Sequence, residues 1–150
     1  MFDPPFGFDR PEDSPGFSLW QATIIWQRLI KKALDPYNIS HSQFVIMALL
    51  LWFKAHNYDT TQTLIINWSK LDKMTVSKSL KKLVAQGLVH RFELKTDTRA
   101  KSVFLTDKGK DLVYQLVPIV EKIDAEFFGK VLERDKQLLI QILKKLVADS

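Results

Sequence analysis

Residues 72–87 read DKMTVSKSLKKLVAQG, and this stretch decides the fold. Its apolar residues recur at steps of three and four positions, which predicts an amphipathic helix from Lys73 to Gln86 with one buried stripe. A short helix from Gln62 to about Trp68 and a three-residue turn precede it, so the two helices form a helix-turn-helix. The buried stripe consists of Val76, Leu80, Leu83 and Val84, and the opposite face of Met74, Thr75, Lys78, Lys81 and Lys82, with Ser77 on its flank.

The outer face of this helix suits duplex DNA. Hydroxyl and ammonium groups near the start of a helix can enter the major groove, which is ~12 Å wide, and meet base edges and phosphates. The segment from Lys70 to Lys101 holds nine basic and three acidic residues, a net +6, so the other 118 residues of this +5 chain sum to −1. Solvated helix faces are also rich in lysine, so the charge alone leaves both interpretations open.

After Gly87 the helical period gives way to a strand-like one. Residues 88–94 and 101–106 predict a two-stranded hairpin, joined by a polar turn at residues 95–100. A hairpin that follows a helix-turn-helix is placed to act as a wing, whose basic side chains reach phosphates or the narrower minor groove. The basic residues at its tip are Lys95, Arg99 and Lys101.

Further helices are expected on both sides of this region. Residues 1–17 hold four of the six prolines and are predicted to be an irregular N-terminal arm. Amphipathic helices are predicted at 18–35 and 41–55. After the hairpin, Asp107 is expected to cap a long helix in which Pro118 predicts a kink or a local break. A last helix carries a narrow apolar seam of Leu139, Ile142, Leu143 and Leu146.

Several function classes find no support in the sequence. The chain has no cysteine, which excludes disulfides, thiolate chemistry and cysteine-based zinc sites. Its three histidines, His41, His56 and His90, lie outside any metalloprotease, nucleophile-elbow or phosphate-loop motif, so we expect no enzyme, no metal site and no cofactor. No apolar run approaches the ~20 residues of a membrane-spanning helix, and the N-terminus does not read as a signal peptide. We expect a cytoplasmic protein that does not act at a membrane.

Residues 97–101, DTRAK, followed by residues 105–109, LTDKG, resemble the wing signature Asp-x-Arg…Leu-Thr-x-x-Gly of the MarR family of transcriptional regulators. Other segments fall where that family places its helix-turn-helix, and the resemblance covers nearly the whole chain from residue 14. These segments are Gln62…Ile65, Asp72–Lys78 and Gln86–Arg91, together with Ser14–Phe17 and Ser42–Phe44.

The resemblance implies roles for individual side chains. Thr75, Ser77 and Lys78 would contact bases or nearby phosphates. Asp97 would brace Arg99 so that it reaches the minor groove, although an Asp–Arg bridge that only stiffens the hairpin is the alternative. Whether Met74 reads a base or packs against the helix pair stays open. The predicted DNA-binding residues are Lys73, Thr75, Ser77, Lys78, Lys81, Lys82, Lys95, Asp97, Arg99 and Lys101.

Together these patterns predict an α+β, mainly helical fold, a winged helix-turn-helix domain with N- and C-terminal dimerisation helices. We expect one domain at 18–150, with the DNA-binding lobe at about 58–106 and dimerisation helices at about 18–35 and 107–148. Members of the family are dimers built from their first and last helices, and the apolar seam of the last helix needs a partner surface. A homodimer would place two recognition helices about 34 Å apart, as a pseudo-palindromic operator requires.

The resemblance also implies a small-molecule effector that releases a repressor from DNA. In the family the effector pocket lies between the dimerisation helices and the DNA-binding lobe, and by analogy the ligand is a small aromatic or phenolic acid. Aromatic residues that lie in this part of the sequence are more often part of the hydrophobic core than in contact with a ligand. The candidate ligand residues are Trp20, Trp26, His41 and Trp52.

A winged helix can also serve protein contacts, because fold does not determine function. This alternative predicts weak DNA binding that is insensitive to salt. A DNA-binding regulator instead predicts that the logarithm of the affinity falls linearly with the logarithm of the salt concentration, with a slope of ~0.9 for each phosphate neutralised.

Overall fold

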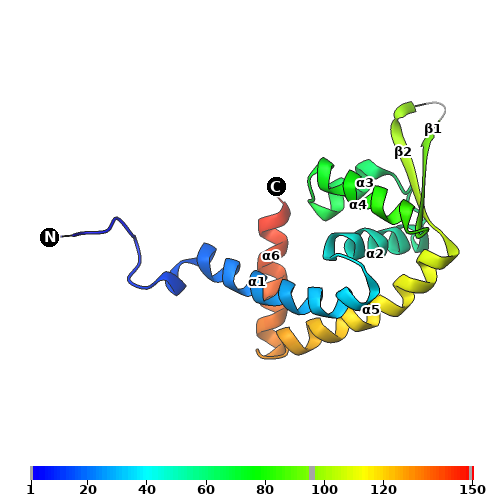
Figure 1. Ribbon diagram of the computed structural model, residues 1–150. Coiled ribbons are helices and arrows are strands. Elements are labelled where there is room, and N and C mark those ends of the chain that lie inside the picture. The colour runs from blue at the N-terminus through cyan, green and yellow to red at the C-terminus, as the bar shows by residue number, and fades with distance from the viewer. Residues whose placement is uncertain (1, 95–96, 149) are drawn as a thin grey trace.

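Six α-helices and one hairpin follow one another in the computed structural model, which describes residues 2–94, 97–148 and 150 (Figure 1). For residues 93, 94 and 97–101 only the backbone is described. No helix within these residues is long and apolar enough to cross a membrane. The elements are η1 (Pro11–Asp13), α1 (Pro15–Leu34), η2 (Asp35–Tyr37), α2 (His41–Ala55), α3 (Gln62–Ser69), α4 (Lys73–Ala85), β1 (Val89–Leu94), β2 (Asp97–Leu105), α5 (Asp107–Phe128) and α6 (Glu133–Ala148).

Helix α2 lies at the centre of this fold. It contacts α1, α3, α4, α5 and β2, and apolar residues occupy nearly every position from 44 to 53, as a helix covered on most sides requires. Its start is a capping box, in which the Ser40 hydroxyl accepts from the Gln43 backbone N–H and the Gln43 side chain accepts from the Ser40 N–H. Each surrounding element adds one apolar stripe, and the fully buried residues are Ile30, Leu34, Ile46, Met47, Phe53, Ile65, Val76, Leu80, Leu83, Val103, Val113 and Leu116. The predicted mainly helical winged-helix fold is confirmed.

Two predicted helix starts were wrong. α1 begins at Pro15, inside the segment 1–17 predicted to be irregular, because the Ser14 hydroxyl caps the helix and proline fits its first position, where the missing N–H would have no partner. α5 is capped by Thr106 and not by Asp107, since the Thr106 hydroxyl accepts from the Gly109 N–H at 3.0 Å. α5 also continues through Pro118 without a local break. The buried residues Val113, Leu116 and Val120 on both sides of that proline hold the helix against the core.

The two strands form an antiparallel hairpin, which we call the wing. Its register pairs Val89 with Leu105 and Phe92 with Ser102, and shifts between Glu93 and Leu94. β2 begins at Asp97, four residues earlier than predicted, because pairing with β1 extends the strand through residues that lack a strand pattern of their own. The loop before α3 joins the edge of the wing through a hydrogen bond of 2.7 Å from the Val103 N–H to the Thr60 carbonyl.

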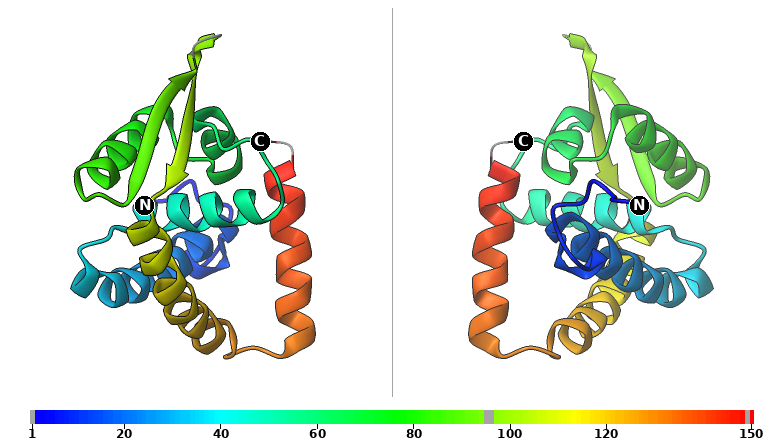
Figure 2. Two further views of the ribbon diagram at one scale, coloured as in Figure 1. Left: turned by 90° about the vertical axis from the view of Figure 1, so that its right-hand side faces the viewer. Right: turned by 90° about the vertical axis from the view of Figure 1, so that its left-hand side faces the viewer.

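Helix α6 differs from the other α-helices because no residue in it is buried. It turns back after α5 and stands apart from the core, as both views in Figure 2 show. Two residues of the predicted seam are exposed, Ile142 by 45% and Leu146 by 62%, whereas Leu139 and Leu143 are half-buried and line a pocket together with residues of α5. The exposed surface of α1 also carries apolar residues, among them Leu19, Trp20, Ile25 and Leu29.

Candidate nucleic-acid interface

Asp72 caps the N-terminus of α4 by accepting hydrogen bonds from two groups of Thr75. The Asp72 carboxylate accepts hydrogen bonds from the Thr75 backbone N–H at 2.8 Å and from the Thr75 hydroxyl at 2.7 Å. These donors lower the pKa of Asp72 below its ordinary value, so the carboxylate stays charged at the positive end of the helix dipole. The hydrogen of the Thr75 hydroxyl is therefore engaged within the chain and not free for a DNA contact.

The two faces of α4 divide largely as the sequence predicts. Val76, Leu80 and Leu83 are fully buried against the core. Val84, assigned to the same stripe, is 42% exposed, because it lies at the edge of the stripe and no neighbouring element covers it. Met74, whose position the sequence left open, is 66% exposed in the first turn of the helix and does not pack against the helix pair. The outer face consists of exposed Lys73, Met74, Lys78, Lys81 and Lys82, with Thr75 and Ser77 half-buried beside them.

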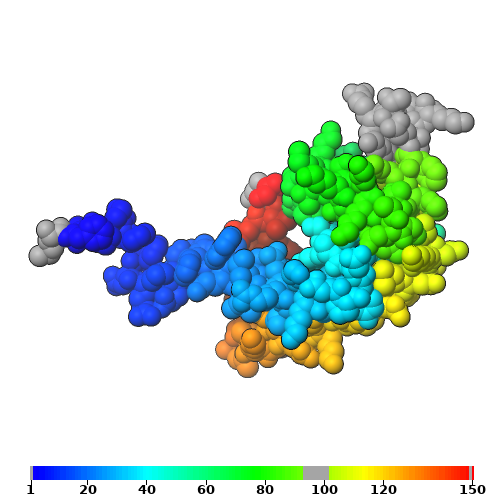
Figure 3. Space-filling model, in the orientation of Figure 1, coloured from blue at the N-terminus to red at the C-terminus, as the bar shows by residue number. Residues whose placement is uncertain are grey.

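The recognition helix and the wing lie at the same end of the molecule. Figure 1 shows α3, α4 and the wing opposite the turn between α5 and α6, and Figure 3 shows the first half of α1 and the N-terminal segment projecting from the rest. One face can therefore present α4 and the wing together, as groove binding by a winged helix requires.

The base of the wing is joined tightly to α5 and to the end of α4. The Thr106 N–H donates to the Leu88 carbonyl at 3.0 Å, and the Thr106 hydroxyl donates to the Gly87 carbonyl at 2.7 Å. Gly109 lies against the same backbone, since a Cβ at this position would lie 2.0 Å from the Leu88 oxygen. This close approach explains the threonine and glycine of the Leu-Thr-x-x-Gly motif, for which the sequence analysis offered no physical reason.

The tip of the wing falls partly outside the described residues. Lys95 lies outside them, as do the side chains of Asp97, Arg99 and Lys101, so the predicted contact between Asp97 and Arg99 stays a prediction. The backbone places Lys101 opposite Glu93 in the hairpin register, and Asp97 and Arg99 lie in β2 and not in the turn.

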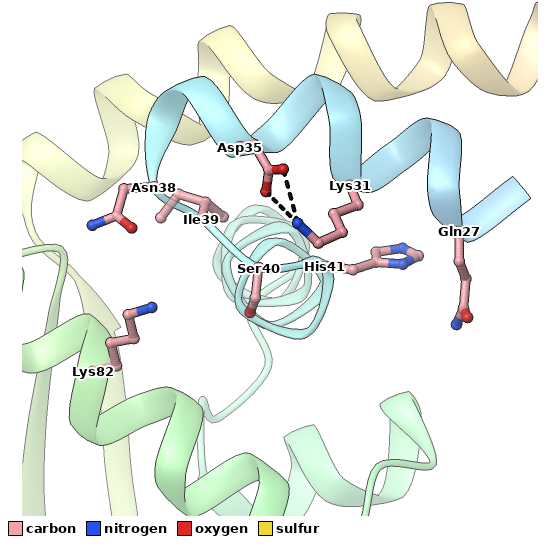
Figure 4. A pocket seen from close by; sticks show the side chains of 8 residues that line it. All are labelled: Gln27, Lys31, Asp35, Asn38, Ile39, Ser40, His41 and Lys82. Carbon is pink, nitrogen blue, oxygen red and sulfur yellow. Dashed lines mark hydrogen bonds and ion pairs between the residues drawn. The ribbon is translucent and has the colours of Figure 1, made fainter. Parts of the chain in front are cut away.

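A pocket of about 400 Å³ opens where the end of α1, the start of α2 and α4 meet (Figure 4). We call it the α1–α2 pocket. Lys31 on its rim is paired with Asp35 at 2.8 Å, while the amine of Lys82 from α4 points toward the turn between α1 and α2. Its lining residues are Gln27, Lys31, Asp35, Asn38, Ile39, Ser40, His41 and Lys82.

Only part of the predicted ligand set meets at this pocket. His41 lines it, and Trp26 packs edge-on against the His41 ring at 5.0 Å while its indole N–H donates to the Asp124 carboxylate at 2.7 Å. Burial lowers the pKa of His41 below its ordinary value, and the charge of Asp124 opposes this shift. Trp20 is 63% exposed on α1 and does not line the pocket. Trp52 belongs to a separate aromatic cluster with His56, Tyr58 and Trp68.

Two glutamines beside the pocket were missed by the sequence analysis. Gln43 is only 1% exposed, and its Nε2 donates to the Gln86 Oε1 at 2.8 Å, which joins α2 to the end of α4. The spacing Ser40-x-x-Gln43 signals a capping box and could have indicated the local half of this arrangement. Among the described residues no group of three or more histidine or acidic side chains is arranged to hold a metal ion.

A helix-turn-helix with a basic outer face beside a two-stranded wing defines a winged-helix DNA-binding protein. Residues 35–122 match the family described as ArnR1-like, winged-helix domain. The HTH-type transcriptional regulator YdcH of Bacillus subtilis is 37% identical over 139 residues, which cover 91% of this chain and 95% of that protein. The chain therefore belongs to the ArnR1-like winged-helix family and is a transcriptional regulator of the MarR type, which confirms both the predicted family and the predicted non-enzymatic class.

Solved structures of two other DNA-binding proteins share this fold. BpsR of Bordetella bronchiseptica, whose DNA binding is regulated by 6-hydroxynicotinic acid, superposes with a TM-score of 0.83 at 22% identity and covers 96% of this chain and 99% of its own. MepR of S. aureus in complex with DNA superposes with a TM-score of 0.80 at 20% identity, covering 91% of this chain and 98% of its own. At these identities the two structures establish the fold.

Proposed function

We propose that this regulator is a homodimeric repressor that binds a pseudo-palindromic operator and is released by a small aromatic acid. One observation carries the proposal: the exposed basic face of α4 lies at the same end of the molecule as the wing. In the proposed complex α4 of each subunit enters the major groove and the wing contacts flanking phosphates or the minor groove. Bound across a promoter, such a dimer represses by occluding it.

Residue roles on DNA follow from position and exposure. Lys78 and Lys81 project from the outer face of α4 and would neutralise phosphates, while Met74 in the first turn is free to meet the methyl group of a thymine. Lys82 lies nearest the α1–α2 pocket and would contact only the edge of the DNA. The proposed contact set stays Lys73, Thr75, Ser77, Lys78, Lys81, Lys82, Lys95, Asp97, Arg99 and Lys101. Within it Thr75 would act only through its hydroxyl oxygen as an acceptor, because Asp72 engages the hydroxyl hydrogen.

The dimer is proposed from the open faces of α1 and α6. A lone amphipathic helix is marginal in water unless it packs on a partner, and α6 has no buried residue in a single subunit. Apolar area buried at ~25 cal/mol per Å² on both helices would favour association. We therefore assign dimerisation to about residues 18–35 and 107–148 and DNA binding to about residues 58–106. Light scattering after size exclusion would contradict this assignment if it gave the mass of one chain.

The effector is proposed for the α1–α2 pocket, which lies between those two parts. Asp35 neutralises Lys31, so the amine of Lys82 and the Ser40 hydroxyl are the groups best placed to bind a carboxylate. The volume of about 400 Å³ suits a ligand with a single aromatic ring. BpsR, whose fold is similar, responds to an aromatic acid of this size.

Fluorescence anisotropy tests the DNA-binding part of the proposal. The protein is titrated with DNA from upstream of its own gene and with a scrambled duplex, from low to physiological salt. We expect selective binding whose log affinity falls with log salt by ~0.9 for each phosphate neutralised. Lys78→Ala should weaken binding several-fold, whereas Lys130→Ala, at the turn between α5 and α6, should leave it unchanged. Weak, equal and salt-insensitive binding to both duplexes would favour a winged helix that contacts proteins.

Isothermal titration tests the effector part. Salicylate and 6-hydroxynicotinate are the probes, and we expect heat from at least one of them together with loss of DNA affinity. Lys82→Met should abolish the heat and leave the fold intact. No heat from either probe would remove the aromatic-acid assignment, while selective DNA binding would still stand. In vitro transcription from a template that carries the bound sequence then separates repression from activation.

A further inference from the structure

A chain of three hydrogen bonds links four polar groups between the start of α2 and the end of α4. The Gln43 Oε1 accepts from the Ser40 backbone N–H at 2.9 Å, and the Gln43 Nε2 donates to the Gln86 Oε1 at 2.8 Å. The Gln86 Nε2 in turn donates to the Asn38 carbonyl at 3.0 Å. Each side-chain amide thus uses one donor and one acceptor within the set. We call the two side chains and their partners the glutamine bridge.

The bridge joins two parts of the chain with different proposed tasks. At one end, Asn38 and Ser40 belong to the turn between α1 and α2 and line the α1–α2 pocket. At the other end, Gln86 is the C-cap residue of α4, and the amine of Lys108 donates to its backbone carbonyl at 3.1 Å. The side chain of Gln86 therefore joins the C-terminal end of α4 to the turn, 48 positions along the chain from Asn38, beside the pocket that Lys82 of α4 also lines.

Because Gln43 is buried, its hydrogen bond to Gln86 constrains how α2 and the end of α4 can move relative to each other. Gln43 is only 1% exposed, so water cannot replace Gln86 as its partner, and an unpaired amide there would keep its full desolvation cost. The residues that α4 buries in the core, Leu80 and Leu83 among them, are apolar, and apolar contacts are not directional. A shift that moves Ser40 and Gln43 must therefore either carry the end of α4 with it or break the partly buried Gln43–Gln86 hydrogen bond, whereas the Gln86–Asn38 hydrogen bond is exposed.

We propose that the glutamine bridge couples the α1–α2 pocket to the recognition helix, with Gln43 and Gln86 as positioning residues. This inference rests on the proposed function, since it specifies how the pocket regulates DNA binding. A ligand that displaces Asn38 or Ser40 moves the C-terminal end of α4 through Gln86. Coupling between sites is reciprocal, so an effector that weakens DNA binding must itself bind less tightly when DNA is bound. We therefore expect DNA bound to α4 to favour the ligand-free arrangement of the turn at residues 35–41.

Reciprocity allows a test that needs no effector. Hydrogen–deuterium exchange is measured by mass spectrometry on the full chain, free and bound to the duplex found by anisotropy. In the wild type we expect DNA to slow exchange in α4 and also in residues 35–41, the latter by about fivefold or more. In Gln86→Met, which keeps the shape of the side chain and removes its hydrogen bonds, only α4 should be protected.

Two further variants sharpen the comparison. Gln86→Glu keeps the acceptor for Gln43 and loses the donor for Asn38. It should therefore also uncouple residues 35–41 from α4, without leaving Gln43 unpaired. This variant replaces Gln86→Met in the test if Gln86→Met does not fold. Gln115→Met makes the same chemical change at an exposed glutamine on α5 and should behave as the wild type.

The outcomes separate the inference from the function on which it rests. DNA protection of α4 without protection of residues 35–41 in the wild type would overturn the coupling, as would full protection of that turn in both Gln86 variants. Lack of protection anywhere would overturn DNA binding itself. In that case, faster exchange at residues 35–41 in free Gln86→Met than in the free wild type, and not in Gln115→Met, would still show that Gln86 holds the turn. Equal exchange in free Gln86→Met and the free wild type would contradict the glutamine bridge.

Discussion

Replacing Gly109 by alanine tests how closely the wing is joined to the rest of the fold. Gly109 is the third residue of α5, and a Cβ there would lie 2.0 Å from the Leu88 oxygen and 2.9 Å from the Leu88 carbonyl carbon. Ordinary contact begins at 3.4 Å, so the two backbones would have to separate by about 1.4 Å. The Leu88 oxygen accepts from the Thr106 N–H, and a shift of that size breaks this bond.

The expected cost follows from three effects. Overpacking costs roughly 1–3 kcal/mol. The broken hydrogen bond costs about 1 kcal/mol, and the better helix propensity of alanine returns about 1 kcal/mol. We therefore expect Gly109→Ala to lower the free energy of unfolding by about 2 kcal/mol, which lowers the melting temperature by roughly 4–8 °C in a chain of this size.

Thermal and urea unfolding at one fixed protein concentration measure this change, since the proposed dimer would make stability depend on concentration. Gly16→Ala is the matched control. Gly16 also lies in the first turn of a helix, but a Cβ there meets only the Ser14 oxygen, at 3.9 Å, so this variant should be as stable as the wild type or slightly more stable. Equal stability of the two variants would refute the close approach of α5 to Leu88.

Three other predictions concern the dimer, the wing and pH. Leu146→Glu, in the open seam of α6, should shift the dimer toward single chains in light scattering, whereas Lys144→Glu should not; an unchanged mass for Leu146→Glu would contradict the proposed interface. Arg99→Ala should lose several-fold in DNA affinity while the dimer survives, and undiminished affinity would remove Arg99 from the contact set. Burial lowers the pKa of His41, so the folded state binds a proton less readily than the unfolded chain, and stability should fall as the pH drops below about 6.5. His41→Gln should weaken this dependence in urea midpoints measured across that range, and an unchanged pH profile would show that His41 does not cause it.

Local patterns predicted the parts of the fold that depend on neighbours in sequence. The buried stripe of Val76, Leu80 and Leu83 follows helical spacing, and the structure buries all three. Val84 fits the same spacing but lies at the edge of the stripe, where burial depends on whether another element covers it. The early start of β2 has a similar cause, because Asp97 pairs with Leu94 of β1, a contact that no local pattern indicates.

The candidate pocket shows where sequence reasoning ends. His41 and Trp26 were named because they lie in sequence near the place where the family has its effector pocket, and the structure brings these two together. Trp52 has the same chemistry but lies in another cluster, so residue type alone did not separate the two positions. Gln43 and Gln86 are 43 positions apart, and only the packing of α2 against α4 brings their amides within hydrogen-bonding distance.

Helix α5 runs from the base of the wing to the turn before α6, so a bend within this helix would move the wing relative to α6. At ~1.5 Å per residue, the part of α5 before Pro118 is about 16 Å long. A bend of about 5° at that proline, where the helix lacks a backbone hydrogen bond, would displace the wing by ~1.4 Å in each subunit. Two subunits would combine such displacements across an operator whose half-sites lie about 34 Å apart. The fit to DNA can thus change by more than an ångström while every helix stays folded.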